Sequence, residues 1–161
     1  MLEGIHKIHL IGIGGSGMRA IANILIQKGY EVSGSDVKES DVIERFRKMG
    51  ATVHIGHNAD YVQGVDAVVR STAIREDNPE IVAAKEQGIT ILHRSDIVKA
   101  VLDVTNGIAV AGAHGKTSTT SMIGQILVEG QMEPTVIIGG EVDYLKGSSC
   151  LGKGEYSVVE A

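Results

Sequence analysis

Two glycine-rich turns hold the residues of this chain that are best suited to chemistry. The first turn, Gly12-Ile13-Gly14-Gly15-Ser16-Gly17, has the spacing G-x-G-x-x-G. Gly12 permits a tight turn, Gly14 lets the backbone approach a diphosphate without a Cβ in the way, and Gly17 lets a helix pack against a strand. A helix starting there offers free N–H groups and a partial positive charge to phosphate. The turn therefore predicts a nucleotide diphosphate site, and the alternative is a strand-to-helix corner without a ligand.

Asp36 stands 19 positions after Gly17, in the segment Ser33-Gly34-Ser35-Asp36. In folds that use such a turn, a carboxylate about 20 residues further on contacts a ribose. The spacing fits any ligand with a diphosphate and a ribose, so it does not identify the nucleotide. The alternative role for Asp36 is to cap the following helix.

The second turn, Gly112-Ala113-His114-Gly115-Lys116-Thr117, carries a Gly-Lys-Thr core. Lys116 is suited to reach β- and γ-phosphates, Thr117 to place its hydroxyl on Mg²⁺, and the backbone N–H groups of 114–118 to surround phosphate oxygens. The common P-loop, G-x-x-x-x-G-K-[ST], would need Gly at position 110, where Val110 stands. This turn is therefore a shorter P-loop and predicts a nucleoside triphosphate site.

Alternating strands and helices must position both turns. Apolar runs predict strands at 7–12, 30–35, 52–55, 67–70 and 90–92, with helical spacing at 16–28, 42–49, 79–87 and 95–102. This order favours an α/β fold with a Rossmann-like parallel sheet of five strands and helices on both faces. The polar segment 103–107 is typical of a linker. A strand at 108–111, a helix at 116–128 and strands at 135–138 and 157–160 follow it.

Length and composition limit the function. The 161 residues allow one domain and part of another, at about 150 residues per domain. We expect a complete domain at 1–104 and the truncated start of a P-loop α/β ATPase domain at 105–161. The net charge is −5, without a basic cluster that would bind nucleic acid or an anionic membrane. One cysteine, no long apolar run and no signal peptide indicate a cytoplasmic protein.

Several weaker signals lie at other strand ends. Ser71, Thr72 and Ala73 follow the strand 67–70, and Arg94 follows the strand 90–92, where ligands of open α/β sheets bind. His54 and His57 have a spacing that metal ligands use, but no cysteine or histidine cluster accompanies them, which favours an exposed turn.

Four segments together resemble the Mur ligases. They are IHLIGIGGSGM (8–18), VSGSD (32–36), STAIREDNPE (71–80) and AGAHGKTSTT (111–120), in that order. The resemblance covers the whole chain. It implies that the first turn binds the uridine diphosphate part of a sugar nucleotide, not NAD, and that the short P-loop binds ATP.

The resemblance also implies roles for individual residues. The residues implied for the UDP-sugar are Gly14, Gly15, Ser16, Gly17, Met18, Ser35, Asp36, Ser71, Thr72, Ala73 and Arg94. Those implied for ATP are Gly112, Ala113, His114, Gly115, Lys116, Thr117, Ser118 and Thr119. Lys116 would be catalytic, and Thr117 and Glu160 would bind Mg²⁺. Ala113 departs from the family, which commonly has Thr there.

The activity implied is ATP-dependent amide formation in peptidoglycan precursor synthesis. A muramyl carboxylate of UDP-N-acetylmuramate would be activated as an acyl phosphate and joined to L-alanine. Because the family places its amino-acid site in a further domain, we expect these 161 residues to bind the nucleotide without ligating. The alternatives are a family member that recycles murein tripeptide, an NAD-dependent oxidoreductase domain, which leaves the Gly-Lys-Thr turn unexplained, and a stand-alone P-loop module. The sequence does not indicate an oligomeric state.

Overall fold

Five parallel strands form the first sheet of the computed structural model, which describes residues 2–161. Their order is β3-β2-β1-β4-β5, and each pairs in parallel with its neighbours. The strands are β1 (Lys7–Ile11), β2 (Glu31–Asp36), β3 (Thr52–Ile55), β4 (Ala67–Arg70) and β5 (Thr90–His93). The strand order reverses at β1 and β4, so the first glycine turn lies where ligands of doubly wound sheets bind. The five-stranded parallel sheet predicted from the sequence is confirmed.

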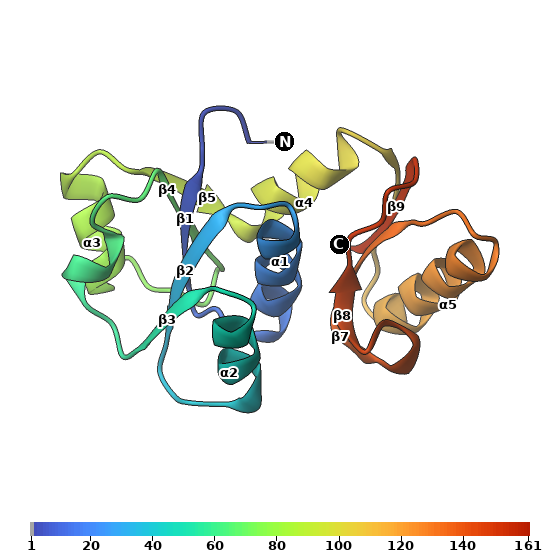
Figure 1. The fold of residues 1–161 in the computed structure, drawn as a ribbon, viewed down its shortest axis with the longest axis horizontal. Helices are drawn as coiled ribbons and strands as arrows, with labels where there is room; N and C mark the ends of the chain where they lie inside the picture. The colour runs from blue at the N-terminus through green and yellow to red at the C-terminus, as the bar shows by residue number, and fades with distance from the viewer. Residues whose placement is uncertain (1) are drawn as a thin grey trace.

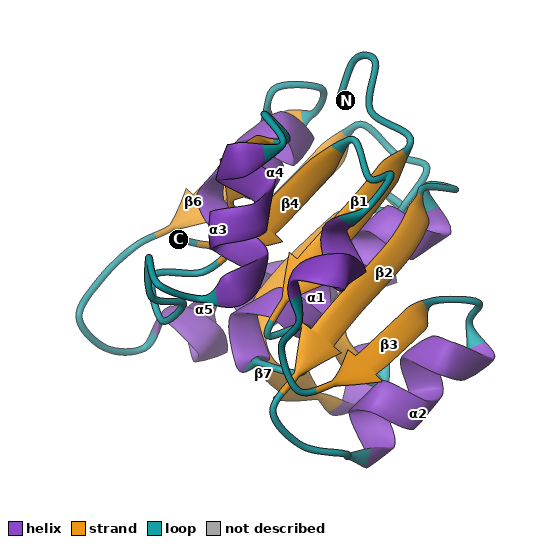
Figure 2. Cartoon of the chain, turned by 90° about the vertical axis from the view of Figure 1, so that its left-hand side faces the viewer, coloured by secondary structure: helices purple, strands orange, loops and turns teal. Residues whose placement is uncertain are grey.

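Helices cover both faces of this sheet, as predicted (Figures 1 and 2). The cluster of buried apolar residues on one face includes α1, α2 and α4, and the cluster on the other face includes α3 and the short helix η1. The bounds are α1 (Ser16–Gln27), α2 (Asp41–Lys48), η1 (Ala59–Val62), α3 (Pro79–Glu86) and α4 (Arg94–Leu102). Asn78 caps α3 with Pro79 in its first turn, a favourable start because proline has no N–H to leave unpaired.

The second sheet has four strands in the order β6-β9-β7-β8. Its elements are β6 (Asn106–Val110), α5 (Lys116–Glu129), β7 (Thr135–Val142), η2 (Asp143–Leu145), β8 (Gly147–Cys150) and β9 (Tyr156–Glu160). β8 is antiparallel to β7 and was not predicted. The predicted linker 103–107 is wrong in its second half, because Asn106 and Gly107 belong to β6 and pair with Tyr156 and Ser157 of β9.

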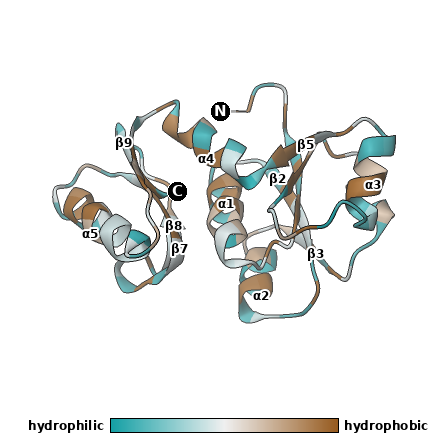
Figure 3. Cartoon of the chain, turned by 180° about the vertical axis from the view of Figure 1, so that it is seen from behind, coloured by the Kyte–Doolittle hydropathy of each residue, from teal (hydrophilic) through white to brown (hydrophobic). Residues whose placement is uncertain are grey.

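Helix α1 lies between the two sheets (Figure 1). The side chains of Ile21, Ile24 and Leu25 are fully buried, and Figure 3 shows hydrophobic residues along α1. Ile137 of β7 and Val159 of β9 belong to the same buried cluster as α1. Burial on two sides explains why α1 is apolar over more than one stripe.

Polar contacts also join α1 to the second sheet. Asn23 Nδ2 donates to the backbone oxygen of Ser149 at 3.1 Å and to Ser149 Oγ at 3.0 Å, and Arg19 pairs with Glu141 at 3.2 Å. These contacts hold α1, which follows the turn 12–17, against β7 and β8 of the second sheet. No helix within residues 2–161 has the length and apolar character needed to cross a membrane.

Replacing Asn23 by Ala should lower the free energy of unfolding by about 1 kcal/mol, because two part-buried hydrogen bonds to Ser149 are lost. Urea denaturation of the variant and of Lys28→Ala, an exposed position at the end of the same helix, measures this. Equal stabilities of the two variants would contradict the role of Asn23 as a link between the sheets.

Candidate functional site

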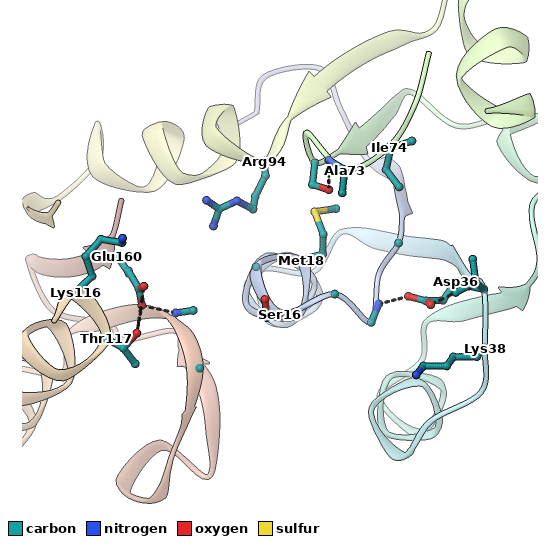
Figure 4. A pocket seen from close by; sticks show the side chains of 18 of the residues that line it. Ser16, Met18, Asp36, Lys38, Ala73, Ile74, Arg94, Lys116, Thr117 and Glu160 are labelled. Atoms are coloured by element: carbon teal, nitrogen blue, oxygen red, sulfur yellow. Dashed lines mark hydrogen bonds between the residues drawn. The ribbon is translucent and has the colours of Figure 1, made fainter. Parts of the chain in front are cut away.

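A cavity of about 790 Å³ lies at the carboxyl ends of the strands of the first sheet and extends to the second sheet (Figure 4). It brings the two glycine-rich turns to one site. The residues predicted from the sequence that line it are Gly14, Gly15, Ser16, Gly17, Met18, Asp36, Ser71, Ala73, Arg94, Lys116, Thr117 and Glu160.

The first turn is shaped by hydrogen bonds to the end of β2. The N–H groups of Gly12 and Ile13 donate to the backbone oxygen of Ser35 at 2.8 and 3.1 Å. Asp36 Oδ2 accepts the Gly14 N–H at 2.8 Å, and Asp36 Oδ1 accepts the Val37 N–H at 2.8 Å. The Asp36 carboxylate therefore holds the backbone of the turn through the Gly14 N–H, a role that the sequence did not indicate.

Two glycines of this turn lie close to side chains of neighbouring elements. A Cβ on Gly14 would lie 2.9 Å from Asp36 Oδ2, and a Cβ on Gly17 would lie 3.0 Å from Arg94 Cδ. Helix α1 starts at Ser16 without a side-chain cap or an acidic residue in its first turn, among the residues described. Residues 15–18 at the start of this helix line the cavity, and the free N–H groups of a helix N-terminus suit an anion.

The second turn opens α5. Gly115 has a φ of 77° directly before the helix, a left-handed conformation that favours glycine. Lys116 Nζ donates to the backbone oxygen of Gly112 at 2.7 Å, so the lysine folds over its own loop. This places its charge at the start of a helix, where phosphate oxygens bind.

A hydroxyl and a carboxylate lie beside this lysine. Thr117 Oγ1 donates to Glu160 Oε2 at 3.0 Å, and Glu160 Oε2 also accepts the Gly139 N–H at 2.8 Å (Figure 4). Oxygen ligands from one carboxylate and one hydroxyl, completed by phosphate and water, are the ligands that Mg²⁺ prefers. The donor set therefore fits Mg²⁺.

Other predicted residues lie outside the cavity lining. They are Ser35, Thr72, Gly112, Ala113, His114, Gly115, Ser118 and Thr119. Ser35 is fully buried, and its Oγ donates to Glu80 Oε2 at 2.7 Å, so its side chain supports the site from behind.

The cavity lining also includes residues that the sequence analysis did not single out for this site. These are Val37, Lys38, His57, Ile74, Gly139, Gly140 and Ala161; Gly12 of the predicted diphosphate turn lines the cavity as well. The expectation of an exposed turn is wrong for His57, whose side chain is only 22% exposed. The signal for His57 in the sequence was its position just after the strand 52–55, at the carboxyl edge of the sheet where the other predicted site residues lie.

His57 belongs to a buried polar network around Glu80 of α3. Glu80 Oε1 contacts His57 Nδ1 at 2.8 Å, and Glu80 Oε2 contacts His9 Nε2 at 2.9 Å. The side chains of Glu80 and His9 are fully buried. Burial raises the pKa of Glu80, but the hydrogen bonds from His9, Ser35 and His57 outweigh it and hold the pKa below its usual value.

The fold and the site together define a class of protein. It is an α/β protein in which a Rossmann-like sheet with a G-x-G-x-x-G turn is joined to a second sheet with a short Gly-Lys-Thr turn, and residues of both turns line one cavity. The chain belongs to the Mur ligase family, because the family model "Mur ligase family, catalytic domain" matches residues 7–105.

Individual relatives agree with this assignment. The chain is 47% identical to the UDP-N-acetylmuramate–L-alanine ligase of Desulfatibacillum aliphaticivorans over 97% of this chain and 34% of the relative. It is 47% identical to the same-named ligase of Solidesulfovibrio magneticus over 100% of this chain and 35% of the relative. The chain therefore spans about a third of the length of these curated relatives.

Solved structures give the same result. A UDP-N-acetylmuramate-alanine ligase from Thermotoga maritima matches with a TM-score of 0.87 and 35% identity, over 96% of this chain and 37% of that chain. A UDP-N-acetylmuramate:L-alanyl-gamma-D-glutamyl-meso-diaminopimelate ligase from Neisseria meningitides matches with a TM-score of 0.89 and 27% identity, over 98% and 53%.

Proposed function

We propose that this chain is the nucleotide-binding part of an ATP-dependent ligase that joins L-alanine to UDP-N-acetylmuramate. The observation that carries the proposal is the single cavity that joins the diphosphate turn at Gly14–Gly17 to Lys116, Thr117 and Glu160. A sugar nucleotide on the first turn and ATP on the second would bring a carboxylate substrate toward a γ-phosphate. The names of the relatives supply the identity of the two substrates.

Each part of the chain has a separate task in this proposal. Residues 1–104 bind the UDP-sugar, and residues 105–161 contribute the P-loop for ATP. Lys116 and Thr117 hold phosphate oxygens, and Thr117 and Glu160 hold Mg²⁺. The bound Mg²⁺ would neutralise charge on the transferred phosphoryl group. Identity of 47% to alanine-adding relatives, against 27% to the structure of the tripeptide-adding ligase, favours L-alanine.

Thermal denaturation with each ligand tests the proposal. UDP and ATP–Mg²⁺, each held at 100 times its dissociation constant, should each stabilise the chain by about 2.7 kcal/mol. Because the two turns are distinct, the two effects should add. Stabilisation by UDP that ATP–Mg²⁺ abolishes, or no response to either, would contradict two adjoining sites.

Replacing Asp36 by Ala should weaken UDP binding by up to about tenfold, because the carboxylate that holds the Gly14 and Val37 N–H groups is lost. Asp36→Asn keeps one oxygen acceptor and should lose less affinity. Calorimetric titration measures both, and an unchanged affinity in Asp36→Ala would show that the diphosphate turn does not depend on this side chain.

A further inference from the structure

A second cavity, of about 250 Å³, lies where the two sheets join and shares no lining residue with the nucleotide cavity. Its walls come from α1, the end of α2 and the segment from η2 to β8. Three basic side chains line it, from Arg19 of α1, Arg45 of α2 and Lys146, which follows η2. No aspartate or glutamate among residues 2–161 lines it, although the net charge of the chain is −5. Positive charge concentrated in this way attracts an anion.

The protein itself neutralises these three cations only in part. Arg45 and Lys146 have no carboxylate within ion-pair distance in the described part of the chain. Arg19 pairs with Glu141 at 3.2 Å, but that glutamate side chain is 57% exposed, and the Nε of Arg19 is buried without a hydrogen-bond partner. Three positive charges therefore face one water-exposed carboxylate.

The other polar side chains of the cavity wall are already hydrogen-bonded to each other. Asn23 Nδ2 donates to Ser149, and Gln27 Nε2 donates to Asn23 Oδ1 at 2.9 Å. The free donors are thus on the arginines and the lysine. Because a guanidinium presents parallel N–H groups that match the oxygens of phosphate, these donors suit an oxyanion.

The backbone of Lys146 has a conformation that is unusual for lysine. Its φ of 50° and ψ of 35° place it in the left-handed region, which glycine or asparagine usually occupies at a helix end. A lysine is strained there, and strained residues gather at ligand sites. The strain is accounted for if the charged side chain has a binding task at this position.

The neighbouring carboxylates indicate which end of the groove an anion would occupy. Arg19 and Arg45 also line an adjoining cavity, together with Asp36, Asp41 and Glu141. Like charges repel an anion from that side. The end beside Lys146, where no carboxylate lines the wall, is therefore the favourable place.

We propose that this second cavity binds a small oxyanion of the phosphate class through Arg19, Arg45 and Lys146. The bound anion joins α1 and α2, which cover the first sheet, to the η2–β8 segment of the second sheet. Because only the folded chain brings these elements together, the anion stabilises the fold. The site is independent of the proposed ligase function.

A titration with inorganic phosphate, followed in the ¹H–¹⁵N NMR spectrum of the whole chain, tests the site. Sodium chloride holds the ionic strength constant. The amide signals of residues 146–149 should shift saturably, and their titration is read separately from that of the two glycine-rich turns. Glycerol phosphate in place of phosphate shows whether a phosphate monoester is also accepted, and binding of either one supports the oxyanion site.

Arg45→Gln and Lys146→Gln should each weaken the phosphate affinity read at residues 146–149 by at least about fivefold, because each removes a charge-assisted hydrogen bond. Lys48→Gln is the matched control, since it removes the same charge from an exposed position of α2 that does not line the cavity. All three positions are exposed, so the variants should fold. The turn amides should respond to phosphate equally in all of them.

Thermal denaturation tests the stabilising role. Phosphate, compared with sodium chloride at equal ionic strength, should raise the melting temperature of Lys48→Gln more than that of Lys146→Gln. Equal rises would overturn the stabilising role. Absence of shifts at residues 146–149, shifts that sodium chloride reproduces, or unchanged affinity in both Arg45→Gln and Lys146→Gln would overturn the site itself.

Discussion

Replacing Lys116 by Ala is expected to weaken ATP–Mg²⁺ binding at least tenfold. Lys116 is the first residue of α5 and lines the cavity beside Thr117 and Glu160. A charge-assisted hydrogen bond contributes about 1.5 to 3 kcal/mol, and about 1.4 kcal/mol corresponds to a factor of ten in affinity. The bond of Lys116 Nζ to Gly112 shows that the side chain reaches across the loop where phosphates would lie.

Two controls accompany this titration. Lys28→Ala removes an exposed lysine at the end of α1, far along that helix from the turn, and should leave ATP affinity unchanged. UDP binding to Lys116→Ala should also be unchanged, because the first turn belongs to the other sheet. An intact ATP affinity in Lys116→Ala would remove this lysine from the site.

Replacing Glu80 by Ala should lower the free energy of unfolding by about 3 to 5 kcal/mol. The carboxylate is fully buried and accepts hydrogen bonds from His9, Ser35 and His57. Its removal leaves the buried groups of His9 and Ser35 without a partner. Glu86→Ala, at an exposed position of the same helix α3, is the comparison and should change stability by less than about 0.5 kcal/mol. Urea denaturation that gives equal values for both variants would contradict a structural role for the network.

The pH dependence of stability gives an independent test of Glu80. Because its hydrogen bonds hold the pKa below the ordinary value of 4.5, ionised Glu80 stabilises the folded state at pH values above 4.5. That contribution is lost as the pH falls through the lower pKa of the folded state. The difference in stability between the wild type and Glu80→Gln should therefore shrink as the pH falls below 4.5. A difference independent of pH would show that Glu80 is not ionised in the folded protein.

Strands β1, β4 and β5 could be predicted because each is a short segment rich in apolar residues. The antiparallel strand β8 (GSSC) could not be predicted from its own residues, because they have little β-propensity. Pairing with β7 holds them in a strand. The segment 103–107, which contains Asn106 and Gly107, is polar in composition and predicts a linker. Asn106 and Gly107 lie in a strand because β9, about 50 residues later, supplies their hydrogen-bond partners.

The two phosphate-binding turns could be predicted because each is a contiguous segment with a fixed spacing. The buried network around Glu80 could not be predicted, because His9 and Glu80 are 71 residues apart in the sequence. Each of these polar residues, taken alone, would be expected at the surface. The placement of His57 at the cavity also depends on that network, through its contact with Glu80. Burial of Ser35 likewise depends on how α3 packs on the sheet, which its own segment does not encode.

We propose that the turn at Gly14–Gly17 binds a uridine diphosphate sugar. Calorimetric titration of this chain with UDP-N-acetylmuramate and, separately, with NAD tests it most directly. We expect saturable binding of UDP-N-acetylmuramate at one site per chain and no saturable binding of NAD. Binding of NAD without any binding of UDP-N-acetylmuramate would contradict the claim.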